Sequence, residues 1–443
     1  MLRKLANPAW AMLEYGWYPL LLFLTTPWFL HQLGSERYGY WMLLTAAVGF
    51  GGVLNIGTGA ATIKAVSAGM GRADGSDIGG SAIRASIAIA MFGGAALALL
   101  VLFGFLLGGA TLFGRMGDQA LVQQTGIAAS LLIWVEQLDN VFSSAMKGAE
   151  QFGQAARVEI ASKTVQIAAA AAVLWAQPNL SALYLALFVV AFLRLVAKGL
   201  ITRRLFNIVD LRPSLAGAAD ILHFAKWGWL QGVGGVLFGV ADRMLVGSLL
   251  GAASLAYYSI ASQLATQVHA ASAAGLSVIF PKVSRKLERN DRSSLWRVTK
   301  LTMAGNLLLS SSLAMGLILF GPEILRLWIG PVRAAPTTRI LPWLVVAYWL
   351  LAVNVVPYYI LLGMGRIRFV SMTVFIAGVV GVIAMFFATS HLGLVGAPAG
   401  RVVYALISLA LVVPLARHFI RERNAARMQQ RTIDQVPGSG TIP

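Results

Sequence analysis

Long runs of hydrophobic residues, separated by short polar segments, make up most of this chain. A helix of about 20 apolar residues crosses the ~30 Å hydrocarbon core of a bilayer. About twelve runs reach that length, near residues 12–33, 39–62, 85–109, 123–146, 158–176, 181–200, 222–250, 255–280, 299–320, 338–362, 369–389 and 393–416. Strict alternation of apolar and polar residues, which a membrane β-barrel requires, is absent. The pattern therefore predicts an all-α polytopic membrane protein with about twelve transmembrane helices.

One long unit occurs twice in the chain. Residues 33–41 return 217 positions later as residues 250–258, and the same offset relates Val66-Ser67 to Val283-Ser284. Duplicated hydrophobic chains are typical of transporters, in which the substrate path lies between the two halves. We therefore expect two pseudo-symmetric six-helix bundles.

The boundary between the halves lies in a polar, proline-containing segment after the sixth run, residues 203–213. We expect an N-terminal six-helix lobe over residues 1–210 and a C-terminal six-helix lobe over residues 211–422. Residues 423–443 are polar and contain Pro-Gly-Ser-Gly. This composition predicts a disordered cytoplasmic tail.

Composition confirms the membrane class and narrows the chemistry. The 443 residues are 58% hydrophobic and 12% charged, with a mean hydropathy of +0.74, whereas about a quarter of the residues of a soluble domain are charged. Zero cysteines exclude disulfides and thiolate metal sites, and the five histidines lack ligand spacing. The predicted outer loops are too short to house an active site. We expect no metal, no cofactor and no enzymatic activity.

The net charge of +18 would suggest a nucleic-acid partner in a soluble protein. When the loops are assigned alternately to two sides, however, most of the 35 lysines and arginines fall on one side. The positive-inside rule then places both termini in the cytoplasm. We expect attraction to anionic membrane lipids and no nucleic-acid binding.

Four short motifs occur in order along the chain. They are Leu33-Gly34 with Tyr38-Gly39, Gly148–Phe152, Ala241–Gly247 with Leu250-Gly251, and Leu361–Arg366. In this order they resemble the bacterial polysaccharide transporter family, which includes the O-antigen flippases and belongs to the multidrug/oligosaccharidyl-lipid/polysaccharide exporter superfamily. The resemblance runs from about residue 10 to residue 416. The second copy, residues 250–258, lacks the Glu36-Arg37 pair of the first copy and has Ala256 at the position of Gly39.

The resemblance implies a V-shaped pair of bundles that opens alternately to each side of the bacterial inner membrane. It further implies that the substrate is an undecaprenyl-diphosphate-linked oligosaccharide, moved from the cytoplasmic to the periplasmic leaflet. Membrane lipids and other polysaccharide-assembly proteins are the expected partners. The alternative is a cation-coupled multidrug exporter of the same superfamily.

Ionisable groups at membrane depth are functional candidates because their burial is costly. Arginine suits a diphosphate because it stays charged and donates bidentate hydrogen bonds. We therefore predict substrate contacts for Arg243 and Arg401, with Asp242 beside them. The alternative for Arg243 is an ion pair with an acid such as Asp242. For Arg194, near the end of the sixth run, we expect extension to the cytoplasmic surface.

Other polar residues of the runs suggest further roles. Glu136 and Asp139 are three residues apart and could bind a coupling proton or sodium ion; the alternative is structural pairing with Arg194 or Arg157. Gln263 and Gln267, one turn apart, could hydrogen-bond sugar hydroxyls or lock neighbouring helices. Lys64 could attract an anionic headgroup, or serve as an ordinary positive-inside anchor.

Overall fold

The computed structural model describes residues 2–70, 78–177, 179–206, 210–223, 233, 239–276, 292–364 and 366–417. Every regular element within these ranges is helical. The elements are α1 (Leu2–Met70), α2 (Ile78–Leu112), η1 (Gly114–Met116), α3 (Gln119–Gly148), α4 (Phe152–Ala176), α5 (Leu180–Leu205), α7 (Ala241–Leu250), α8 (Ala252–Leu276), α10 (Arg292–Ile329), α11 (Pro331–Gly363), α12 (Ile367–Leu392), η2 (Gly393–Gly396), α13 (Ala399–Ser408) and η3 (Leu409–Leu411). The predicted tail, residues 423–443, lies outside the described residues.

Helix α1 is two helical segments joined by a reversal at Gly34. Twelve residues of straight helix span ~18 Å, yet the rings of Phe29 and Trp41 lie 4.7 Å apart. The hydroxyls of Thr26 and Tyr38 are 3.4 Å apart across the same bend. The two predicted runs on either side of Gly34 therefore pack against each other.

The same backbone turn occurs in both copies of the repeat. Gly34 has φ 71° and ψ 169°, and Gly251, 217 residues later, has φ 86° and ψ 179°. This region of backbone space is essentially restricted to glycine. The duplicated Leu-Gly motif therefore encodes a tight reversal between α7 and α8, as it does within α1.

Helices α3 and α5 begin at side-chain caps that the local sequence supplies. The Oδ1 atom of Asp118 accepts hydrogen bonds from the backbone N–H groups of Ala120 and Leu121 at 2.9 and 3.2 Å. The Oδ1 atom of Asn179 accepts one from the N–H group of Ser181 at 2.9 Å. Such caps satisfy N–H groups that the first helical turn leaves unpaired.

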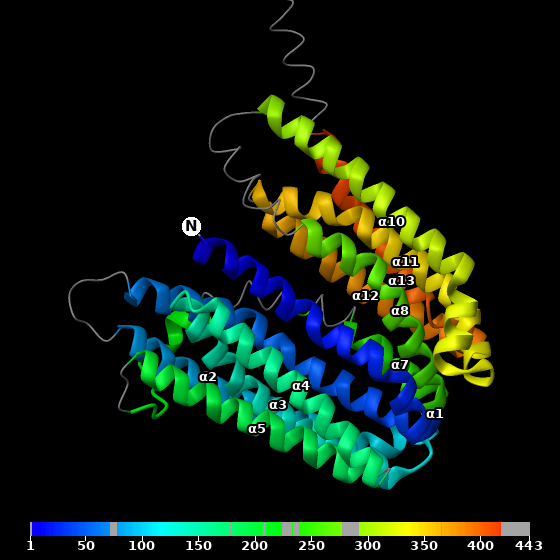
Figure 1. The fold of residues 1–443 in the computed structure, drawn as a ribbon, viewed down its shortest axis with the longest axis horizontal. Coiled ribbons are helices and arrows are strands. Elements are labelled where there is room, and N and C mark those ends of the chain that lie inside the picture. The colour runs from blue at the N-terminus through cyan, green and yellow to red at the C-terminus, as the bar shows by residue number, and fades with distance from the viewer. Residues whose placement is uncertain are drawn as a thin grey trace, which may run out of the picture.

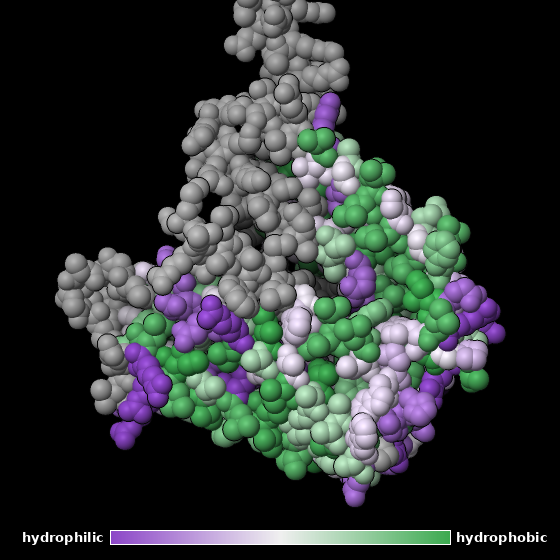
Figure 2. All heavy atoms as spheres, viewed as in Figure 1, coloured by the Kyte–Doolittle hydropathy of each residue, from purple (hydrophilic) through white to green (hydrophobic). Residues whose placement is uncertain are grey.

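Within the described residues, seven helices are long and apolar enough to cross a bilayer. They are Gly79–Leu112, Phe152–Ala176, Leu180–Leu205, Thr299–Ile329, Pro331–Leu362, Arg368–Gly396 and Ala399–Arg417. Figure 2 shows hydrophobic side chains over much of the visible face, with hydrophilic ones gathered mainly toward its margins. The chain is thus a multi-pass helical membrane protein, and the total of about twelve spans stays a prediction. The predicted seventh span, 222–250, lies partly outside the described residues.

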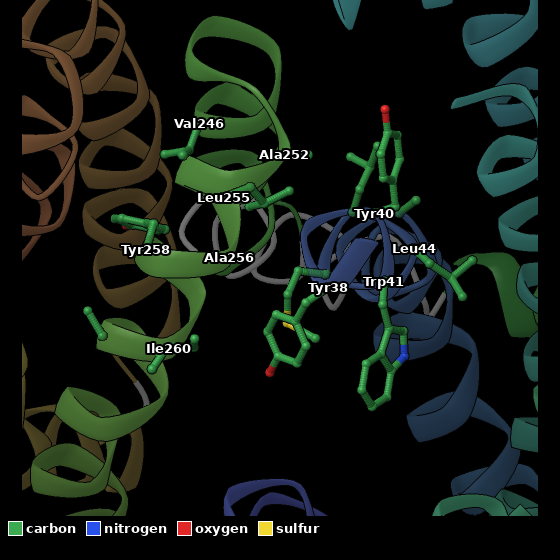
Figure 3. Close-up of a cluster of buried hydrophobic side chains, with 14 of the residues drawn as sticks. Tyr38, Tyr40, Trp41, Leu44, Val246, Ala252, Leu255, Ala256, Tyr258 and Ile260 are labelled. Carbon is green, nitrogen blue, oxygen red and sulfur yellow. The ribbon is translucent and has the colours of Figure 1, made fainter. Parts of the chain in front are cut away.

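Helices α1 to α5 form one bundle and α7 to α13 form another, called here the first and second bundles (Figure 1). They are joined where Gly34 and Gly251 turn. At Gly39 a Cβ atom would lie 2.0 Å from the carbonyl oxygen of Ala252, so glycine permits contact between the two backbones. Figure 3 shows Tyr38 and Tyr40 of α1 beside Ala252, Leu255 and Ala256 of α8.

The short helix η1 completes this contact. Tyr40 of α1 donates its hydroxyl to the carbonyl oxygen of Met116 at 2.7 Å, which fixes η1 to the first bundle. Arg115 of η1 then donates to the carbonyl oxygen of Leu249 in α7 at 2.6 Å. We call the contacts of Gly39, Arg115, Leu249 and Ala252 the outer seal, because the charge distribution predicts that this end of the molecule lies on the outer side.

Candidate functional site

Three helices of the first bundle each present a pair of charged residues on one face. The pairs are Glu136 and Asp139 on α3, Glu159 and Lys163 on α4, and Arg194 and Lys198 on α5. Residues three or four apart lie on the same side of a helix. The six side chains therefore meet between the helices, and we call them the buried charge cluster.

The basic groups of α5 are at the centre of this cluster. Arg194 lies 2.6 Å from Glu136 and 3.0 Å from Glu159, measured from guanidinium nitrogen to carboxylate oxygen. Its Nε atom is 3.2 Å from the carboxylate of Asp139. Lys198 Nζ lies 2.8 Å from Asp139, 2.6 Å from Glu159 and 2.7 Å from the hydroxyl of Ser143.

Three carboxylates and three bases make the cluster formally neutral. The side chains of Arg194 and Lys198 are 2% and 1% exposed, so each needs its carboxylates to offset desolvation. The expectation that Arg194 extends to the cytoplasmic surface is wrong, because three acids hold it between the helices. The structural alternative for Glu136 and Asp139, pairing with Arg194, describes their contacts; ion coupling through them stays a prediction.

A cavity of about 310 Å³ borders the cluster. It is lined by both segments of α1 and by α3, α4 and α5, including Tyr18, Gly52, Glu136, Lys163 and Gln166. Lys163 Nζ lies 4.9 Å from the centre of the Tyr18 ring and 3.9 Å from both Glu136 and Glu159. Lys163 is thus the most loosely held base of the cluster.

In the described part of the second bundle, a buried ion pair joins α7 and α13. Arg401 donates through Nε at 2.8 Å, and also through an Nη atom, to the same oxygen of Asp242. The hydroxyl of Tyr258 donates to that oxygen at 2.8 Å. The Arg401 guanidinium also stacks over the ring of Tyr348, 5.1 Å from its centre. The predicted Asp242 ion pair exists, but with Arg401 rather than with Arg243.

Arg243 has a different environment from its neighbour in sequence. Its backbone N–H group donates to Asp242 at 2.8 Å, while its half-buried side chain has an Nε atom without a hydrogen-bond partner among the described residues. Its guanidinium is within electrostatic range of Tyr18 and Tyr38 of α1. Arg243 therefore faces the first bundle, on the side where the cavity lies.

The remaining predicted site residues lie apart from the cavity lining. Thr26 of α1 donates to Gln263 of α8 at 3.2 Å, and Gln267, which is exposed, donates back to the carbonyl oxygen of Gln263 at 3.1 Å. The glutamines thus include one contact between bundles, as expected for helix locking; sugar binding by them stays a prediction. Lys64 is exposed on α1.

Sequence reasoning missed Glu159, Lys163 and Lys198. Their signal was the four-residue spacing of charges within hydrophobic runs, Glu159 to Lys163 and Arg194 to Lys198. Such spacing marks one face of a helix. The runs 158–176 and 181–200 begin or end near these residues, which made them look like ordinary membrane-edge charges.

Comparisons with known proteins agree with this architecture. The family model described as polysaccharide biosynthesis protein matches residues 90–332, more than half of the chain. One similar curated protein is the probable low-salt glycan biosynthesis flippase Agl15 of Haloferax volcanii, 24% identical over 119 residues. That alignment covers 27% of this chain and only 25% of the relative.

Solved structures share the fold at low sequence identity. Lipid II flippase MurJ in an inward closed conformation has a TM-score of 0.72 and 13% identity, covering 94% of this chain and 87% of that one. An inward-facing MATE family multidrug transporter of the MOP superfamily has a TM-score of 0.66 and 14% identity, covering 94% and 98%. A structure described as the outward-facing conformation of a MATE family multidrug transporter has a TM-score of 0.61 and 13% identity, covering 96% of each chain. These likenesses confirm the superfamily fold expected from the motifs.

Proposed function

This chain belongs to the polysaccharide biosynthesis protein family, and on that premise we propose that it moves an undecaprenyl-diphosphate-linked oligosaccharide across the bacterial inner membrane. The hydrophilic glycan and diphosphate cross between the two bundles while the polyprenyl tail stays in lipid. The distant relative described as a probable glycan flippase supports the same class of substrate. Other polysaccharide-assembly proteins would supply this lipid and consume it.

The proposal depends mainly on the surroundings of the Arg243 side chain. Arg194, Lys198 and Arg401 each have a carboxylate partner within 3 Å. The Arg243 side chain is half-buried, faces the other bundle, and has an Nε atom that finds no hydrogen-bond partner among the described residues. A guanidinium so placed is suited to a diphosphate, which supplies the missing charge and hydrogen-bond acceptors. Arg401, the other predicted arginine, is 4% exposed and braces α13 against α7.

The outer seal supports movement by alternating access. With both termini in the cytoplasm, as the charge distribution predicts, the seal closes the periplasmic end of the molecule. A cytoplasmic lipid headgroup then enters from the opposite end. Outward movement of each negative charge across an inside-negative membrane gains ~2.3 kcal/mol per 100 mV, so the membrane potential favours export.

The alternative, a cation-coupled drug exporter, has the same fold in the solved structures. It needs carboxylates that exchange a cation during the cycle. Glu136 and Asp139, the predicted site, have Arg194 and Lys198 as partners at 2.6 to 3.2 Å. This arrangement favours the flippase over the exporter.

Native mass spectrometry of the protein purified in mild detergent tests the proposal. We expect a co-purified polyprenyl-diphosphate saccharide that is lost in Arg243→Ala and kept in Arg204→Ala, an exposed arginine at the end of α5. Retention of the lipid by a folded Arg243→Ala protein would show that Arg243 does not bind the diphosphate. Binding of ordinary phospholipid alone, together with binding of added cationic drugs, would favour the exporter.

A further inference from the structure

The cavity of the first bundle has the dimensions and chemistry of a binding site. Its volume of about 310 Å³ is at the lower end of the ~300–1,000 Å³ range of ligand pockets. That space holds one sugar ring rather than a whole oligosaccharide. It lies between helices rather than in a loop, so its walls are rigid.

Glycines in the second segment of α1 create the space. Gly49, Gly51 and Gly52 all line the cavity. At Gly51 a Cβ atom would lie 3.2 Å from Gln137 and Ile133, so this glycine serves helix packing. At Gly52 a Cβ atom would have no neighbour within 4 Å. The absence of a side chain at Gly52 therefore leaves room that no other described residue fills.

The polar groups at the cavity are those that the buried charge cluster holds least tightly. The side chains of Glu136 and Lys163 are 27% and 20% exposed, against 2% and 1% for Arg194 and Lys198. The Oε1 atom of Gln166 is buried and has no hydrogen-bond partner within the part of the chain described. Besides Tyr18, Thr45 and Gln137, the lining thus presents an ammonium donor, a carboxylate acceptor and a free amide acceptor. The unpaired amide oxygen is costly unless a ligand donates to it.

The charge balance decides which ligand suits these groups. The cluster contains three acids and three bases, so neither a lone cation nor a phosphate finds an excess of opposite charge. Vicinal hydroxyls, each both donor and acceptor, can bond to Glu136, Lys163 and Gln166 together. An acidic sugar would bring its carboxylate close to Glu136. A neutral hydroxylated ring fits best.

We propose that this cavity binds a neutral sugar of the transported glycan through Glu136, Lys163 and Gln166. The inference rests on the proposed function and adds to it a place for the saccharide. Tyr18 lines the cavity and is within electrostatic range of Arg243. In this proposal the sugar bound here is the one attached to the diphosphate, which Arg243 holds beside the cavity.

The test compares two lipid probes, undecaprenyl diphosphate and undecaprenyl-diphosphate-N-acetylglucosamine. Their binding is measured by native mass spectrometry of the full chain with each probe titrated. Gly52→Leu fills the cavity, and Gly104→Leu is its control because Gly104 also has no neighbour within 4 Å but lies on an exposed face of α2. Gln166→Leu removes the amide acceptor, with the exposed Gln123→Leu as its control.

We expect the unmodified protein to bind the sugar-bearing lipid at least about tenfold more tightly than the bare diphosphate, a difference of ~1.4 kcal/mol. Gly52→Leu and Gln166→Leu should lose this preference and still bind undecaprenyl diphosphate, while both control variants keep it. Equal binding of the two lipids by the unmodified protein, or a preference that survives in Gly52→Leu, would overturn the sugar site. Failure to bind either lipid would instead overturn the proposed function.

Discussion

At the scale of single residues, one oxygen of the Asp242 carboxylate joins three helices. It accepts hydrogen bonds from Arg401 of α13 and from Tyr258 of α8, and its own residue belongs to α7. Both members of the ion pair are 4% exposed. Removal of one member leaves a buried charge without compensation.

Arg401→Met should therefore lower the stability of the protein by ~3–5 kcal/mol. Adding Asp242→Asn to the same chain should recover part of the loss, because the amide carries no charge and still accepts from Tyr258. Thermal unfolding in detergent, followed by the fluorescence of the 12 tryptophans, measures both. Equal melting temperatures of Arg401→Met and the unmodified protein would contradict a structural role for this pair.

The two lysines of the buried charge cluster should differ in the same assay. Lys198 is 1% exposed and has two carboxylates within 2.8 Å, so Lys198→Met should cost ~3–5 kcal/mol. Lys163 is 20% exposed, with carboxylates at 3.9 Å, so Lys163→Met should cost at most about 1 kcal/mol. A stability loss in Lys163→Met as large as that in Lys198→Met would show that the energetic contribution of these lysines does not depend on their burial.

At the scale of elements, the two turn glycines share a conformation but differ in their surroundings. Both have the backbone angles that non-glycine residues adopt only at a cost of ~1–3 kcal/mol. At Gly34 a Cβ atom would meet nothing within 4 Å, whereas at Gly251 it would lie 2.4 Å from the carbonyl oxygen of Arg115. Gly251→Ala thus adds a clash with η1 to the strain.

We expect Gly251→Ala to lower the melting temperature more than Gly34→Ala, and both to do so more than Gly104→Ala in the middle of α2. Thermal unfolding of the three alanine variants provides the measurement. The Gly104 variant controls for helix propensity, because alanine at an unstrained helical position is stabilising. Equal melting temperatures of Gly34→Ala and Gly251→Ala would mean that the contact of Arg115 with the α7–α8 turn does not contribute to stability.

The sequence predicted the elements better than it predicted their charged contacts. Periodic apolar runs and the repeated Leu-Gly motif are local signals, and they identified the helices and both reversals. The partners of Asp139 and Asp242 depend on helix rotation and on residues up to 159 positions away. No local pattern encodes such contacts, which is why the sequence predicts surface extension for Arg194 and names Arg243, rather than Arg401, as a partner of Asp242.

At the scale of the whole molecule, the outer seal consists of contacts from the first bundle to backbone carbonyl groups of the second. Gly39 abuts the carbonyl of Ala252, and Arg115 reaches the carbonyl of Leu249. In the second copy of the repeat the residue at the Gly39 position is Ala256, which is fully buried. Glycine is needed at position 39 because the carbonyl oxygen of Ala252 lies where its Cβ atom would be.

Gly39→Val should therefore separate the two bundles at this end. The chain has no cysteine, so spin labels can be attached at Leu112→Cys and Val332→Cys, exposed positions at the ends of α2 and α11. We expect a longer-distance population by double electron–electron resonance in Gly39→Val and the unchanged distance in Gly104→Val. An unchanged distance in folded Gly39→Val would mean that the seal does not hold the bundles together.

The buried charge cluster also sets an order for membrane insertion. Helix α3 brings two carboxylates, each costing up to ~3.5 kcal/mol at the centre of a lone helix, while their basic partners follow 58 and 59 residues later on α5. A topology reporter fused after residue 150 should reveal incomplete integration of α3, and one fused after residue 206 should not. We therefore expect α3 to integrate stably only once α5 has been synthesised, so that α3, α4 and α5 enter the bilayer as a single unit.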